Sequence, residues 1–210
     1  KNNFAGTFSL KWNILDGLSL YAQYGVYNTN TIHSMYQKVE VDGELNYRGK
    51  GDGTQEKRWS KIRDNFTAYM NYAKVFGDHD ISLMAGYDFS RWRDWYLYAK
   101  STGAVSDKVP TLSSGTVFTA SNNDTQEALV SYYARANYGF KNKYLLGLTV
   151  RADGSSKFAA GHRWGWFPAV SAGWIVSEER MWDKVEDVAN FFKLRASYGY
   201  TGNNGIGLYD

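Results

Sequence analysis

The feature that most constrains this chain is a two-residue alternation of apolar and polar side chains, sustained over unusually long segments. Along 144–151 the even positions are Tyr, Leu, Leu and Val, whereas the odd positions include Thr149 and Arg151. Successive side chains of a strand point to opposite faces, so this period separates an apolar face from a polar one. The same alternation returns along 191–201. An all-β chain of two-faced strands is therefore predicted.

The alternating segments are about twice as long as the five or six residues usual for strands of soluble proteins. We predict eight of them, at 4–15, 18–29, 62–76, 81–100, 127–140, 144–154, 166–176 and 191–201. Strands of this length with one polar face are typical of transmembrane β-barrels. The 43% apolar content and 17% aromatic content fit that class, because every second barrel residue is polar.

The predicted connections alternate between short and long. Short turns are expected at 16–17, 77–80 and 141–143, and long polar loops at 30–60 and 101–125. Outer-membrane barrels show the same asymmetry, with short periplasmic turns and long extracellular loops. On the short side, Ser177 followed by two acids resembles a helix N-cap and predicts one short periplasmic helix within 177–190.

Four blocks of sequence carry a resemblance to a known family. They are RADGSSKF at 151–158, GWFPAVSAGW at 165–174, SEE at 177–179 and LRASYGYTGN at 194–203. In this order they resemble the barrel signature of SusC/RagA-type TonB-dependent transporters. One departure is 159–162, Ala-Ala-Gly-His, because the family pattern has a glycine directly after the phenylalanine that corresponds to Phe158. This departure affects the detail of one loop.

The resemblance implies that residues 1–210 are one partial barrel domain, about eight strands of an antiparallel transmembrane barrel of about 22. It implies energised import of oligosaccharides or peptides across a Bacteroidota outer membrane, without enzyme activity. The implied partners are a SusD-like surface lipoprotein, outer-membrane lipid, and TonB acting through a plug that this chain lacks. No signal peptide begins at Lys1, so we expect either that it has been removed or that the chain is an internal piece.

Other classes of site find little support. The absence of cysteine excludes disulfides and cysteine-bound metals, and the three histidines fall in separate segments. A net charge of +3 argues against a nucleic-acid surface. The glycines of 49–53 lack the spacing of a phosphate loop and indicate a flexible loop. We therefore predict no catalytic residues, no cofactor and no metal.

The candidate site residues lie on the predicted polar face. They are Arg63, Asn65, Arg135, Asn137, Arg151 and Arg195. These side chains either bond neighbouring strands and a plug, or line the path of a hydrophilic substrate. Three tryptophans are expected at loop bases, where they either anchor loops or stack on sugars: Trp59, Trp164 and Trp166.

On the opposite parity, Arg91 and Arg93 follow an apolar stripe and are expected above the membrane. A girdle is predicted just below them, formed by Trp92, Trp95, Tyr96 and Tyr98. Together with the polar face, these residues predict which parts of each strand contact lipid, water and substrate.

Two alternatives remain open from the sequence. One is a self-contained eight-stranded outer-membrane barrel with a structural or adhesive role, in which 4–15 would pair with 191–201. The loop-like segment 205–210 opposes it, because a closing strand with an aromatic end would be expected. The other is a soluble sugar-binding β-sandwich, which strand length opposes.

Overall fold

The computed structural model describes residues 1–37, 53–103, 108–183, 189–203 and 205. By contacts the chain divides into two compact units. The first unit comprises 1–6, 26–63 and 92–126, and the second comprises 7–25, 64–91 and 127–210. Most of the long strands pass from one unit into the other.

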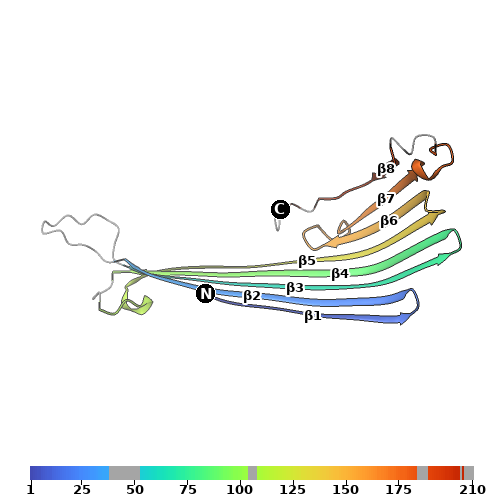
Figure 1. The fold of residues 1–210 in the computed structure, drawn as a ribbon. Helices are drawn as coiled ribbons and strands as arrows, with labels where there is room; N and C mark the ends of the chain where they lie inside the picture. Colours follow the sequence, from blue (N-terminus) through green and yellow to red (C-terminus); the bar gives the residue numbers. More distant parts are fainter. Residues whose placement is uncertain (38–52, 104–107, 184–188, 204, 206–210) are drawn as a thin grey trace. The chain divides into compact units, whose positions relative to one another are not determined.

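The chain forms one antiparallel sheet of eight strands in sequential order (Figure 1). The strands are β1 (Asn2–Leu15), β2 (Leu18–Gln37), β3 (Gly53–Phe76), β4 (His79–Thr102), β5 (Val117–Phe140), β6 (Tyr144–Ser155), β7 (Trp164–Ile175) and β8 (Lys193–Gly199). All eight expected strands are present, and the all-β, antiparallel prediction is confirmed. Two three-residue 3₁₀ turns, η1 (Leu112–Ser114) and η2 (Val176–Glu178), lie in connections.

Several strands extend well beyond their predicted ends. β2 continues to Gln37, β3 begins at Gly53 and β5 begins at Val117. Much of the predicted loops 30–60 and 101–125 is therefore strand. The residues concerned include five Thr with one Tyr, one Trp and one Phe, types that favour strands even where the overall segment is polar. Residues 38–52, which include most of the predicted glycine loop, lie outside the described part of the chain.

The short turns occur where the sequence predicts them. Gly17 has a φ of +79°, the left-handed region that glycine enters without steric cost. Lys141 and Asn142 both have a φ of +54°, which matches the central pair of a type I′ hairpin turn. That turn type follows the right-handed twist of the strands, and Lys143 is one extra residue before the register begins with Phe140 paired to Tyr144.

The prediction of a helix starting at Ser177 is wrong for the described residues. Ser177 is the middle residue of η2, and no side chain caps that turn. β7 runs to Ile175, and the Ser177 backbone N–H donates to the Phe192 carbonyl at 3.2 Å. The segment is therefore tied to the chain just before β8 instead of propagating a helix. No helix among the described residues is both long and apolar enough to cross a membrane.

The sheet has almost no core of its own. Among the described residues only Ala152 and Val176 are buried apolar side chains, whereas Leu148 is 49% exposed. A sheet normally buries its apolar face against a second layer, and the described residues provide none. The sandwich alternative is therefore wrong. β1 and β8 are the two edges of the described sheet and are not neighbours, so the prediction that they do not pair is confirmed, against a closed eight-stranded barrel.

Candidate functional site: a two-faced wall

The registers of β5 to β8 assign side chains to faces directly, because aligned residues of neighbouring strands point to the same side. One aligned row is Ala136, Leu148, Val170 and Tyr198. The next row is Arg135, Thr149, Ala169 and Gly199. We call the face with Leu148 the apolar face and the face with Arg135 the polar face. Leu146, Ala134 and Leu194 fall on the apolar face, and Arg151 and Arg195 fall on the polar one.

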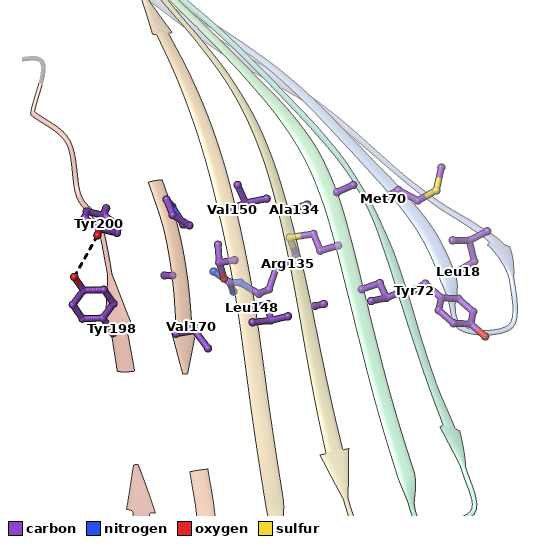
Figure 2. A pocket seen from close by; sticks show the side chains of 17 residues that line it. Leu18, Met70, Tyr72, Ala134, Arg135, Leu148, Val150, Val170, Tyr198 and Tyr200 are labelled. Atoms are coloured by element: carbon purple, nitrogen blue, oxygen red, sulfur yellow. Dashed lines mark hydrogen bonds between the residues drawn. The ribbon is translucent and has the colours of Figure 1, made fainter. Parts of the chain in front are cut away.

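The apolar face carries a broad hollow of about 630 Å³ within the second unit (Figure 2). Small side chains such as Ala134 form part of its lining, between larger ones such as Met70 and Leu148. Figure 2 also shows Tyr198 and Tyr200 at one margin, with their hydroxyls joined at 3.5 Å. Such a surface suits hydrocarbon and not a hydrophilic substrate.

An aromatic row crosses the apolar face toward the ends of the strands that lie away from the short turns. Phe66 contacts Tyr87 with ring centroids 6.1 Å apart, and Tyr87 contacts Tyr132 at 5.3 Å. Tyr132 then stacks on Trp164 at 5.9 Å. Four strands therefore contribute to one continuous line of rings.

A second aromatic row lies beside the short turns. His79 contacts Phe140 at 5.0 Å, Phe140 stacks on Tyr144 at 6.4 Å, and Tyr144 is aligned with Trp174. Along β5 the two rows are separated by the span from Tyr132 to Phe140, roughly 27 Å of strand at about 3.4 Å per residue. With the usual barrel tilt this gives a height of about 20 Å, close to the apolar band of outer-membrane barrels.

Beyond the first aromatic row, the strand positions that continue the apolar face carry charged side chains. In the second unit the Arg91 guanidinium donates to the Asp64 carboxylate, with Nε 2.9 Å from Oδ2, and the Tyr24 hydroxyl donates to the same carboxylate at 3.2 Å. In the first unit Arg93 pairs with Asp124 at 2.6 Å. Both arginines therefore lie past the apolar stripe, as expected, and each is neutralised by an aspartate that the sequence alone did not point to.

On the polar face of the second unit, Arg151 is the centre of a cluster. Its guanidinium donates to Asp153 at 2.7 Å and to Ser131 at 2.9 Å, and lies 3.8 Å from the Asp88 carboxylate. It also lies over the Tyr133 ring, 5.8 Å from the centroid. These contacts hold three neighbouring strands together on the polar face, so this arginine has a clear structural role.

The other candidates of the second unit are more open. Asn137 and Arg195 line a polar trough of about 730 Å³ together with Asp80, Lys193 and other residues. Arg135 is exposed on the same face. Asn65 lies over Gly25, where its amide group occupies the space that a side chain at that glycine would need.

In the first unit, Arg63 and Trp59 are brought together along β3. Arg63 makes a bidentate pair with Asp94, at 2.6 and 3.2 Å. Trp59, on the same face of β3, contacts Tyr96 with ring centroids 5.3 Å apart. Tyr96 thus packs on the polar face, and the predicted girdle that included it is wrong. The aromatic rows of the apolar face lie elsewhere, because alternation separates consecutive aromatics onto opposite faces.

The three candidate tryptophans lie in strands, and only Trp164, the first residue of β7, lies at the base of a loop as predicted. Trp59 is in β3, and Trp164 and Trp166 are in β7. Trp164 and Trp166 are aligned with Gly154 and Ala152, which places them on the apolar face. They are 52% and 69% exposed. Only Trp59 remains on the polar face.

One side chain of the SEE block has a structural role that the sequence did not reveal. The Glu179 carboxylate accepts from the Tyr144 hydroxyl at 2.6 Å and from the Trp174 indole at 3.3 Å, and Lys143 lies 3.5 Å away. These donors, the tyrosine hydroxyl above all, hold the pKa of Glu179 below its usual range. Glu179 therefore joins the turn before β6 to the connection after β7.

The described residues contain no group of three or more His, Cys, Asp or Glu side chains placed to hold a metal ion. The arrangement is a wall with one apolar and one polar face, and its ordered polar groups pair with one another. Such a wall suits a boundary between an apolar and a polar environment.

Comparison with known proteins shows the family to which this chain belongs. Residues 1–210 match the family described as TonB dependent receptor-like, beta-barrel. The chain belongs to this family. It is 31% identical to the TonB-dependent receptor SusC of Bacteroides thetaiotaomicron over 98% of its length, and 38% identical to the TonB-dependent receptor P39 of Formosa agariphila over 68%.

Solved structures agree with the family assignment. A structure of the RagAB peptide importer in its closed-closed state superposes with a TM-score of 0.86 and 26% identity, covering 99% of this chain and 23% of that one. The chain spans about a fifth of the length of SusC and 14% of P39. The SusC/RagA resemblance of the sequence blocks is thereby confirmed.

Proposed function

We propose that this TonB-dependent receptor segment is part of the wall of an outer-membrane nutrient importer. Residues 1–210 are assigned to one partial barrel domain, about eight of about 22 strands. The observation that carries the proposal is the separation of faces in β5 to β8, with Leu148 on one side and Arg151 on the other. The apolar face contacts lipid between the two aromatic rows, and the polar face lines the interior.

The proposed cargo is an oligosaccharide or a peptide, carried without chemical change. Two of the four candidate arginines on the polar face are balanced by carboxylates: Arg63 is paired with Asp94, and Arg151 with Asp88 and Asp153. A selective anion pore would need a denser ring of unpaired cations. Mixed polar walls suit hydroxyl-rich or amide-rich substrates. The role of RagAB as a peptide importer supports the peptide alternative.

The proposed partners act on the two sides of the membrane. A SusD-like surface lipoprotein would receive substrate at the ends of the strands away from the short turns. TonB would supply energy through a plug outside this chain. Transport should therefore depend on the proton-motive force and on the lipoprotein.

The test uses the full-length protein in a strain from which its own gene has been deleted. Uptake of labelled oligosaccharide and peptide mixtures is measured with and without a protonophore, and outer-membrane fractions are probed for the protein. We expect complementation to restore uptake of one mixture and the protonophore to abolish it. Uptake that survives the protonophore, or a protein absent from the outer membrane, would contradict the proposal.

A further inference from the structure

A cavity of about 360 Å³ lies on the polar face of the first unit, and one of the predicted candidates, Trp59, lines it. Its lining is Lys1, Tyr27, Thr29, Thr31, Trp59 and Lys61. Tyr27, Thr29 and Thr31 alternate along β2, and Trp59 and Lys61 do so along β3. Each set therefore presents its side chains to a single face.

Thr29 is the one buried residue in the lining of this cavity. The side chain is only 7% exposed, and its Oγ1 has no hydrogen-bond partner among the described residues. Buried hydroxyls nearly always have a partner, because leaving one unpaired destabilises the fold. The Thr29 Oγ1 atom has almost no accessible surface, so a molecule bound in the cavity can pair with it only after the Thr29 side chain rotates.

Trp59 provides a flat surface with a fixed orientation. Its ring contacts Tyr96 at 5.3 Å with an interplanar angle of 35°, while Trp59 itself lines the cavity. A ring held in this way binds another flat, weakly polar surface with little loss of side-chain entropy. The C–H face of a pyranose ring is such a surface.

Lys61 gives the cavity an excess of positive charge. Its Nζ lies 3.9 Å from Asp94, but that carboxylate already accepts two hydrogen bonds from Arg63, at 2.6 and 3.2 Å. Two cations therefore share one carboxylate. The Lys61 side chain is 50% exposed and can turn to a second anion.

We propose that this cavity binds one acidic sugar unit of the transported substrate. The ring stacks on Trp59 and its carboxylate pairs with Lys61, while rotation of the Thr29 side chain lets its unpaired hydroxyl bond a ring hydroxyl. An acidic peptide fits less well, because β2 and β3 are interior strands whose backbone groups are already paired in the sheet. This inference rests on the proposed function and assigns a substrate class to it.

The test is fluorine NMR of the full-length protein labelled with 5-fluorotryptophan, with the Trp59 signal assigned by W59F. The probes are methyl glucuronide, methyl glucoside and glutamate. We expect a saturable shift with the glucuronide and binding about fivefold weaker for the neutral glucoside, the scale of one exposed ion pair. K61Q should remove this preference, whereas K141Q in the β5–β6 turn should retain it.

Equal shifts with glucoside and glucuronide, no shift with either, or a K61Q variant that keeps the preference would overturn the inference. A response to glutamate equal to that of the glucuronide would favour an acidic peptide and also overturn it. These outcomes are independent of energised uptake by the wild type. If energised uptake is intact and insensitive to W59F and K61Q, the proposed transport function stands. If energised uptake is absent, the transport function is contradicted, whereas the NMR result still reports on sugar binding in the cavity.

Discussion

Leu148 and Thr149 are neighbours in β6 that belong to opposite faces, so they form a matched pair for testing the assignment of the membrane face. Leu148→Arg places a charge in the middle of the apolar band and should destabilise the full-length barrel by about 2–4 kcal/mol. Thr149→Arg adds the same group to the polar face and should cost far less. Urea unfolding in detergent, followed by the gel shift of the folded form, measures both. Equal losses would contradict the facial assignment.

Arg151 and Arg135 form a second pair, both on the polar face. Arg151→Ala would leave the Ser131 hydroxyl, only 1% exposed, without its donor. An unpaired buried hydroxyl costs about 1–3 kcal/mol. Arg135 is exposed, and no hydrogen bond or ion pair connects it to the described residues, so Arg135→Ala should leave stability nearly unchanged. The same urea-unfolding assay measures both variants. A loss of stability for Arg135→Ala as large as that for Arg151→Ala would contradict this difference between the two arginines.

At this scale the sequence predicted which face a residue occupies but not what it contacts. Alternation alone separated Leu148 from Arg151. The pairing of Arg91 with Asp64 depends on how β3 and β4 are aligned, and register is not visible in either strand alone. For the same reason Trp59 could not be connected with Tyr96, although both were recognised as important aromatics.

At the scale of elements, Glu179 should make the β7–β8 connection sensitive to acid. Its pKa is lowered in the folded protein, so its stabilising contribution is complete above the unfolded-state pKa and is lost as the pH falls through the folded-state value. Glu179→Gln should remove that dependence and loosen the connection at neutral pH. Hydrogen exchange of residues 176–183 between pH 3 and 7 measures this, with the exposed Glu178→Gln as control. An unchanged pH profile in Glu179→Gln would contradict the role of this carboxylate.

The connection between β2 and β3 is a second element with a proposed task, which is capture of the surface lipoprotein. Deleting 38–52 and joining Gln37 to Gly53 through a short Gly-Ser linker preserves both strands. We expect the full-length variant to fold but to lose most lipoprotein capture in pull-downs, and uptake with it. A shortened turn at 16–17 or 141–143 is not a suitable control, because those turns fix register. Glu178→Gln, an exposed position in the β7–β8 connection at the opposite ends of the strands, serves instead. Retention of capture and uptake by a folded 38–52 deletion would contradict this role.

Element boundaries were harder to predict than the elements themselves. The polar runs before Gln37 and after Gly53 are strand, because hydroxyl and aromatic side chains tolerate a solvated sheet. Conversely, Ser177 and its acids look like a helix start, but η2 is a single 3₁₀ turn. There the backbone bond from Ser177 to Phe192 and the bonds to Glu179 outweigh local helix propensity.

At the scale of the whole molecule, β1 and β8 each leave one edge without a partner in the described sheet. In lipid an unpaired strand edge is far more costly than in water, because no solvent satisfies its N–H and C=O groups. Contact of the apolar face with lipid, as proposed, is favourable, whereas unpaired strand edges in lipid are not. Further strands between β8 and β1 satisfy both conditions, and the coverage of only 23% of the matched RagAB chain agrees with them.

This conflict predicts the behaviour of residues 1–210 on their own. Refolded into detergent or lipid vesicles, the isolated segment should fail to give the compact, heat-modifiable, protease-resistant monomer that the full-length protein gives. It should associate through its edges, because β1 and β8 are the only strands of the described sheet that can pair further. Gel mobility before and after heating, with light scattering for mass, measures this. A monomeric, protease-resistant segment with β1 crosslinked to β8 through introduced cysteines would instead establish a small closed barrel, and the larger wall proposed here would be wrong.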